Sequence, residues 1–113
     1  MHEPTRVIDR QLAAYNDRDL DRWLATYAAN AEQFLADGTL LAHGRAQMEE
    51  RMRARFADRH LHATLLHRIV VGETVVDHER VTRSAPGGIE SVEMVCVYVV
   101  RGGEIVRATF AFG

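Results

Sequence analysis

The sequence predicts an α+β fold, in which helices come first and an antiparallel sheet follows. Apolar residues recur at helical spacing over residues 7–27 and again from about Arg45. From His62 onward, four extended apolar runs are separated by short glycine-containing turns, as in a meander of hairpins. Helices and strands segregated in this order pack as helices on one face of a bent sheet.

Length and composition limit what the protein can be. With 113 residues, one domain over residues 1–113 is expected. The net charge of −2 and the mixing of both signs argue against nucleic-acid and membrane partners. The N-terminal MHEPTR has no apolar signal core, and the single cysteine, Cys96, excludes an internal disulfide. We therefore expect a soluble cytoplasmic protein without a cofactor or bound metal.

Two helices are expected before residue 30. Pro4 suits a first helical turn, and a break at residues 16–19 supplies capping residues for the second helix. The first helix has its apolar stripe at Val7, Ile8, Leu12 and Tyr15, and the second at Leu20, Trp23, Leu24 and Tyr27.

A short hairpin and a third helix follow. Asp37-Gly38 lies between apolar segments, which is a strong hairpin signal, so Asp37 is read as a turn residue rather than a base. Met48, Met52 and Phe56 recur at helical spacing after the HGR stretch, in which His43 is expected to make a structural hydrogen bond.

The turns of the last four strands predict their pairing. Taking Gly72-Glu73 and Gly102-Gly103 as two-residue turns fixes two ladders, and residues paired across a ladder share a face. The first ladder pairs Val71 with Thr74, Ile69 with Val76, His67 with His78, and Leu65 with Arg80. The second pairs Val99 with Val106, Val97 with Ala108, Val95 with Phe110, and Glu93 with Phe112.

An apolar strip is expected on the face turned away from the helices. In this register the strip contains Met94, Cys96, Tyr98, Val100, Ile105 and Thr109. Because a contiguous apolar face is seldom left in water, the sequence predicts a homodimer through the convex sheet face.

The segments AAYNDRDLDRWLATYA, AHGRAQMEERM and RGGEIVRATFAF, in this order, resemble the nuclear transport factor 2-like superfamily, in its SnoaL-like and ketosteroid-isomerase-like branch. The resemblance runs from about residue 5 to the end. It implies a cone-shaped curved sheet wrapped around three N-terminal helices, with an internal apolar pocket. It also implies pocket-facing positions for Val76, His78, Ala108, Phe110 and Phe112.

The same resemblance implies that ketosteroid isomerase chemistry is missing. Gln11 stands at the position of the catalytic tyrosine, Leu35 at that of the general-base aspartate, and Val95 or Val97 at that of the buried aspartate. Tyr27 matches the supporting tyrosine. Steroid double-bond isomerisation is therefore not expected.

The candidate catalytic residues are His78, His67 and Arg80, at the polar end of the pocket. Histidine exchanges a proton near neutral pH, and arginine can hold a carboxylate or enolate oxygen. The alternative is a polar pair at the pocket wall with no chemical role, tied to Glu79 or Glu93. A metal site formed by the two histidines and Glu93 is a further alternative, but Arg80 would repel the ion.

The expected ligand is a small apolar or amphipathic molecule. The residues expected to line its pocket are Tyr15, Trp23, Tyr27, Met48, Met52, Val76, Glu93, Ala108, Phe110 and Phe112. Either the domain performs isomerase- or dehydratase-like proton transfer, or it is a non-catalytic binding or dimerisation module. Cys96 is read as a buried apolar residue, and His2, His60 and His62 as solvated or boundary residues.

Overall fold

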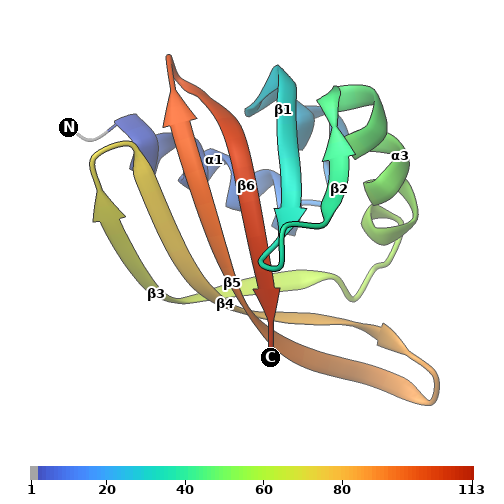
Figure 1. Cartoon of the computed structure of the whole chain (residues 1–113). Helices are drawn as coiled ribbons and strands as arrows, with labels where there is room; N and C mark the ends of the chain where they lie inside the picture. The colour runs from blue at the N-terminus through green and yellow to red at the C-terminus, as the bar shows by residue number, and fades with distance from the viewer. Residues whose placement is uncertain (1–2) are drawn as a thin grey trace.

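The computed structural model describes residues 3–113, so the expectation for His2 lies outside the described residues. Helices cover one face of a curved six-stranded sheet (Figure 1). The elements are α1 (Glu3–Asn16), α2 (Leu20–Ala25), β1 (Tyr27–Leu35), β2 (Leu40–His43), α3 (Gly44–Phe56), β3 (His62–Val71), β4 (Thr74–Ala85), β5 (Gly88–Arg101) and β6 (Glu104–Phe112). The strand order is β2-β1-β6-β5-β4-β3. The predicted α+β class is confirmed, with one parallel pair, β1 and β6, in an otherwise antiparallel sheet.

The two N-terminal helices form where their apolar stripes predict them. Asp19 caps α2 by accepting a hydrogen bond from the backbone N–H of Arg22 at 3.1 Å. The helix ends at Ala25, and Tyr27 already belongs to β1. The prediction that Tyr27 continues the helical stripe was therefore wrong, although its side chain is fully buried against Trp23, with ring centroids 4.7 Å apart.

The short hairpin and the third helix match the sequence pattern. Gly38 has φ +94°, and the Asp37 carboxylate accepts from the Thr39 backbone N–H at 2.9 Å, which is the turn role expected for Asp37. On α3, Met48, Met52 and Phe56 are buried. His43 precedes this helix and lies 3.1 Å from a Glu32 oxygen.

The expected four-strand meander is present, but two β-bulges change which residues lie on each face of the sheet. In the β3–β4 ladder, His67 pairs with His78 as predicted, and the register then shifts so that Glu79, not Arg80, opposes Leu65. In the β5–β6 ladder, Val100 pairs with Ile105, and the register then shifts so that Arg107, not Val106, opposes Val99. Because side chains alternate along a strand, a shift of one residue moves the following residues to the other face.

The predicted outer strip is wrong for most of its members, because the helices cover the face on which these residues lie. Cys96, Tyr98, Val100 and Ile105 face the helices and are buried, each with 2% exposure or less. Cys96 now pairs with Phe110, and Tyr98 with Ala108. The outward face of β5 carries Val95, Val97 and Val99 instead.

The helices and the sheet are joined by specific polar contacts as well as by the apolar core. The Asn16 side chain donates to the carbonyl of Ala63 at 3.0 Å and accepts from its N–H at 2.8 Å, which ties the end of α1 to β3. Among residues 3–113, no helix is long and apolar enough to cross a membrane.

Candidate functional site

A narrow pocket lies between the helices and the concave face of the sheet. The space open to the centres of water-sized spheres is about 40 Å³, which is room for only a few water molecules. The residues that line it are Gln11, Leu12, Tyr15, Trp23, Tyr27, Gln33, Arg51, Met52, Arg55, Glu79, Met94, Cys96, Tyr98, Phe110 and Phe112. Six aromatic side chains and two methionines form about half of the wall.

Glu79 is the acidic residue of this wall. Alternation along β4 turns Val75, Asp77, Glu79 and Val81 toward the helices, and Glu79 is only 4% exposed. The Cys96 thiol lies 3.8 Å from Glu79 Oε1. Burial, and secondarily the charge of Asp77, raise the pKa of Glu79 to about 7. The carboxyl group can therefore both hold and release a proton near neutral pH.

Asp77 is held differently, although it lies on the same face of β4. Arg68 donates to both oxygens of Asp77, from Nε at 2.7 Å and from Nη2 at 2.9 Å, and to Asp9 of α1 at 2.6 Å. Asp77 is fully buried. Arg68 pairs with Asp77 across the β3–β4 ladder, and its contact with Asp9 places both residues under α1.

Three tyrosine hydroxyls surround the pocket. Burial raises the pKa of Tyr15 to about 12, and it raises the pKa values of Tyr27 and Tyr98 further. These hydroxyls therefore stay protonated at neutral pH and can donate hydrogen bonds.

Several buried polar atoms of the pocket lack a hydrogen-bond partner. Among residues 3–113 these atoms are Trp23 Nε1, Tyr27 Oη, Gln33 Nε2 and Glu79 Oε2. All four belong to residues of the pocket wall. Because buried polar groups are nearly always satisfied, a group of unsatisfied ones in one pocket indicates a site that receives a polar ligand or water.

The three predicted catalytic residues do not line this pocket. His78 and Arg80 alternate with Glu79 on β4, and His67 pairs with His78, so these side chains lie on the opposite, convex face. The two imidazole rings stack with centroids 6.0 Å apart, and His78 Nε2 lies 2.6 Å from Glu93 Oε1. The prediction that the pocket ends in His67, His78 and Arg80 does not hold for this pocket, because strand alternation indicates which residues share a face but not which face the helices cover.

The expected ligand-contacting residues divide into three groups. Six of them line the pocket: Tyr15, Trp23, Tyr27, Met52, Phe110 and Phe112. Met48 and Ala108 are buried in the core without lining the pocket. Val76 pairs with Val97, and Glu93 pairs with Arg80. Both residues therefore lie on the convex face, outside the pocket.

Sequence reasoning missed Glu79, Gln33, Arg51 and Arg55. An acidic residue at every second position, as in Asp77 and Glu79, is the usual pattern of a solvated strand face. The signal that could have found Glu79 is its place between Val75 and Val81, in phase with apolar residues. Arg51 and Arg55, one helical turn apart beside Met52, carried no signal that distinguishes them from a solvated helix face.

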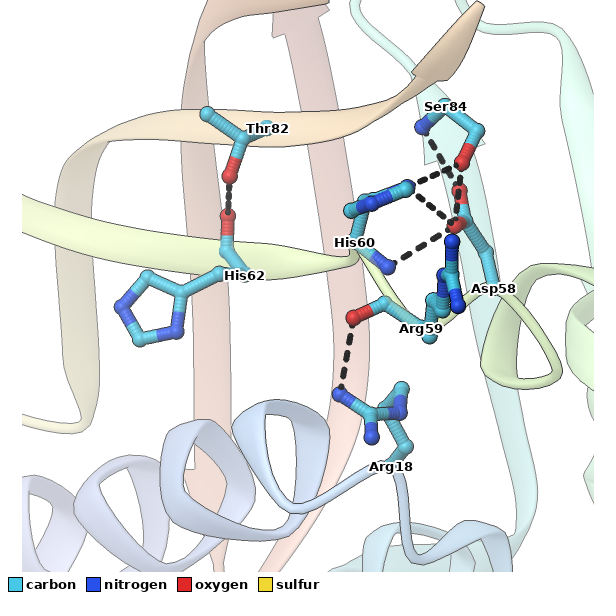
Figure 2. A network of polar contacts seen from close by, with 7 residues as sticks. All are labelled: Arg18, Asp58, Arg59, His60, His62, Thr82 and Ser84. Atoms are coloured by element: carbon cyan, nitrogen blue, oxygen red, sulfur yellow. Dashed lines mark hydrogen bonds and ion pairs between the residues drawn. The ribbon is translucent and has the colours of Figure 1, made fainter. Parts of the chain in front are cut away.

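A second polar cluster brings together serine, histidine and aspartate (Figure 2). Ser84 Oγ lies 2.7 Å from Asp58 Oδ1 and 2.7 Å from His60 Nδ1. Hydrogen bonds from the side chain and backbone of Ser84 lower the pKa of Asp58 to about 2, so the ionised carboxylate takes the single hydroxyl proton. The hydroxyl can then only accept from His60, so His60 cannot activate it as a nucleophile. The cluster instead ties the segment before β3 to β4.

Among residues 3–113, no group of three or more histidine, cysteine, aspartate or glutamate side chains is placed to hold a metal ion.

Comparison with known proteins identifies the family. The model of the SnoaL-like domain matches residues 8–108. An NTF2-like protein of unknown function from Burkholderia pseudomallei is 20% identical, with a TM-score of 0.86 over 100% of this chain and 92% of that chain. TerC, co-crystallised with polyporic acid, is 18% identical, with a TM-score of 0.84 over 99% and 92%. IdmH from Streptomyces antibioticus, a proposed polyketide cyclase, is 19% identical, with a TM-score of 0.82 over 98% and 92%.

No curated protein matches the sequence. The match to the family model covers most of the chain, and the similar structures have the same curved sheet and helices. The chain therefore belongs to the SnoaL-like domain family.

Proposed function

We propose that this domain binds a small, flat, mainly apolar molecule in its pocket and that Glu79 exchanges a proton with that molecule. The observation that carries the proposal is the position of the Glu79 carboxyl group. It is buried in the pocket wall, and Oε2 has no partner among the described residues. A buried carboxyl group in a cleft is a candidate acid or base.

The chemistry of the surrounding groups supports this role. A pKa of about 7 leaves both protonation states of Glu79 populated at neutral pH, as general acid–base catalysis requires. The hydroxyls of Tyr15, Tyr27 and Tyr98 stay protonated and can donate to an oxygen that becomes negative when the ligand loses a proton. Isomerase-, dehydratase- or cyclase-like reactions all use such a step.

Structural relatives support the small-molecule part of the proposal. TerC was crystallised with polyporic acid, and IdmH is a proposed polyketide cyclase. The rival proposal is a non-catalytic binding module, which the narrow pocket favours because little space is open without movement of Met52, Met94 or the arginines.

Exchange of a carbon-bound proton separates the two proposals. 2-Tetralone is flat, apolar and has acidic hydrogens beside its carbonyl group, so their replacement by deuterium in D₂O can be followed by NMR. Wild-type protein should accelerate this exchange, and the rate should rise with pH through about 7 because Glu79 must be ionised to accept the proton. Glu79→Gln should lower the accelerated rate by roughly 100- to 10,000-fold.

The matched variant in this assay is His78→Gln, on the other face of β4. Exchange that survives His78→Gln and is lost in Glu79→Gln supports the proposal. Loss in His78→Gln alone would return the role to the residues that the sequence first suggested. Binding of 2-tetralone without acceleration by wild-type protein would favour the non-catalytic module.

A homodimer through the convex face remains part of the proposal, with a different set of residues. Ile69, Val71 and Val95 are exposed there, by 63%, 72% and 37%. Val76, Val97 and Val99 lie between them in register and are half-buried. A second copy would cover this strip about a two-fold axis. The expected cytoplasmic location rests on the sequence features alone.

A further inference from the structure

Two arginines of α3 turn toward the pocket. Arg51 and Arg55 lie one helical turn apart, and both line the pocket wall. Among residues 3–113, neither guanidinium group makes an ion pair with a carboxylate. Arg53 on the same helix differs, because it is exposed and pairs with Glu49 at 3.0 Å.

The neighbours of Arg51 are neutral. Its Nη1 donates to Gln33 Oε1 at 3.2 Å and lies 3.4 Å from Met52 Sδ. Its guanidinium carbon lies 5.9 Å from the centre of the Phe110 ring. Burial lowers the pKa of Arg51, and the positive charge of Arg55 lowers it further. Two like charges therefore lie close together in a partly desolvated place, which is unfavourable until an anion binds between them.

Glu79 does not supply that anion. Among residues 3–113, no ion pair joins Glu79 to Arg51 or to Arg55. Glu79 comes from the sheet side of the pocket and the two arginines come from the helix side. The pocket thus has an acidic group on one side and, on the other, two cations without a carboxylate partner in the described part of the chain.

We propose that Arg51 and Arg55 form an anion subsite, and that the ligand of this pocket is a flat organic acid whose carboxylate binds there. The planar guanidinium forks match a carboxylate, which can take two parallel hydrogen bonds from each. The aromatic walls formed by Trp23 and Phe110 would take the ring of the acid. This inference rests on the proposed function, because it concerns the same pocket.

A pair of probes of the same shape tests the subsite. 2-Naphthoate carries a carboxylate, and 2-naphthamide is its neutral counterpart. Trp23 is the single tryptophan of the chain and lies in the pocket wall, so the quenching of its fluorescence reports binding directly. Wild-type protein should bind 2-naphthoate about 10- to 100-fold more tightly than 2-naphthamide, as expected for charge-assisted hydrogen bonds.

Three arginine substitutions locate the effect. Arg55→Met and Arg51→Met should each remove most of the preference for 2-naphthoate and leave the affinity for 2-naphthamide within about 2-fold. Arg53→Met makes the same change of charge on the outer side of α3 and should keep the preference. Arg51→Lys serves as the second variant at that position if the loss of the contact with Gln33 unfolds Arg51→Met.

The outcomes distinguish this inference from the proposed function. Equal affinity of wild-type protein for both probes overturns the anion subsite, as does failure of 2-naphthoate to bind at millimolar concentration. An equal loss of preference in Arg53→Met also overturns it, since the effect would then be one of overall charge. The exchange of 2-tetralone hydrogens needs no carboxylate, so it should survive Arg53→Met, on the outer side of α3, and be lost in Glu79→Gln whether or not the arginines bind an anion.

Discussion

Asp77 and Glu79 lie two residues apart on the same buried face of β4, and only Asp77 has a cationic partner. Arg68 binds both oxygens of Asp77, while Glu79 Oε2 has no partner among the described residues. Asp77 is therefore a structural anion. Glu79, whose pKa lies near neutrality, is the group that titrates.

Glu79→Gln should remove a pH dependence of stability. Burial raises the pKa of Glu79 from its ordinary value of 4.5 to about 7, so between these pH values the folded protein keeps a proton that the unfolded chain has released. The free energy of unfolding of the wild type should thus fall by roughly 3 kcal/mol as pH rises across this window. Urea unfolding at several pH values measures the slope. A variant with the same slope as wild type would assign it to other groups.

Arg68→Met should strongly destabilise the fold. The substitution leaves the Asp77 charge buried without a partner, which costs roughly 3–5 kcal/mol. Adding Asp77→Asn to Arg68→Met should recover much of that loss, because the uncompensated charge is removed. Arg101→Met breaks an exposed pair with Glu73 and should cost less than about 1 kcal/mol. Equal losses in Arg68→Met and Arg101→Met, measured by denaturant unfolding, would contradict this account.

Asn16→Ala should loosen the end of α1. The Asn16 side chain makes two hydrogen bonds with the backbone of Ala63, and their loss leaves a partly buried N–H and carbonyl unpaired. We expect a loss of roughly 1–3 kcal/mol in unfolding free energy and faster amide exchange at Ala63. Asn30→Ala, at an exposed position of β1, is the matched control and should be close to neutral. An unchanged rate of amide exchange at Ala63 would show that the hydrogen bonds from Asn16 do not hold the end of α1 to β3.

Val97→Glu should disrupt the proposed dimer. Val97 lies at the centre of the convex strip, between Val76 on β4 and Thr109 on β6. A carboxylate there would have to be desolvated in the interface, so sedimentation should detect monomers. Ile89→Glu changes another exposed apolar residue, near the turn between β4 and β5, and should leave the dimer intact. A wild-type monomer at micromolar concentration would rule out the dimer. Tyr98→Glu would instead disrupt the core, because Tyr98 is buried against the helices.

The helices and turns were predictable because their signals are local. The stripe that includes Val7 and Ile8, the Asp19 cap and the Gly38 turn each depend on a few neighbouring residues, and the structure confirms them. The fold class follows from the order of these elements. Six of the residues expected to contact a ligand line the pocket, since large apolar side chains on the helices and on β6 are buried whichever residues surround them.

The faces of β4 and β5 depend on tertiary structure. A strand pattern determines which residues share a face, but not which face the helices cover, and each β-bulge reverses the assignment beyond it. His78 and Glu79 are adjacent in sequence, and burial under α1 gives Glu79 its raised pKa and leaves His78 with Glu93 on the other face. The sequence by itself thus determined the elements and the strand pairing close to the turns. Packing of the helices against one face of the sheet decided which ionisable groups lie in the pocket, because desolvation acts only on the covered face.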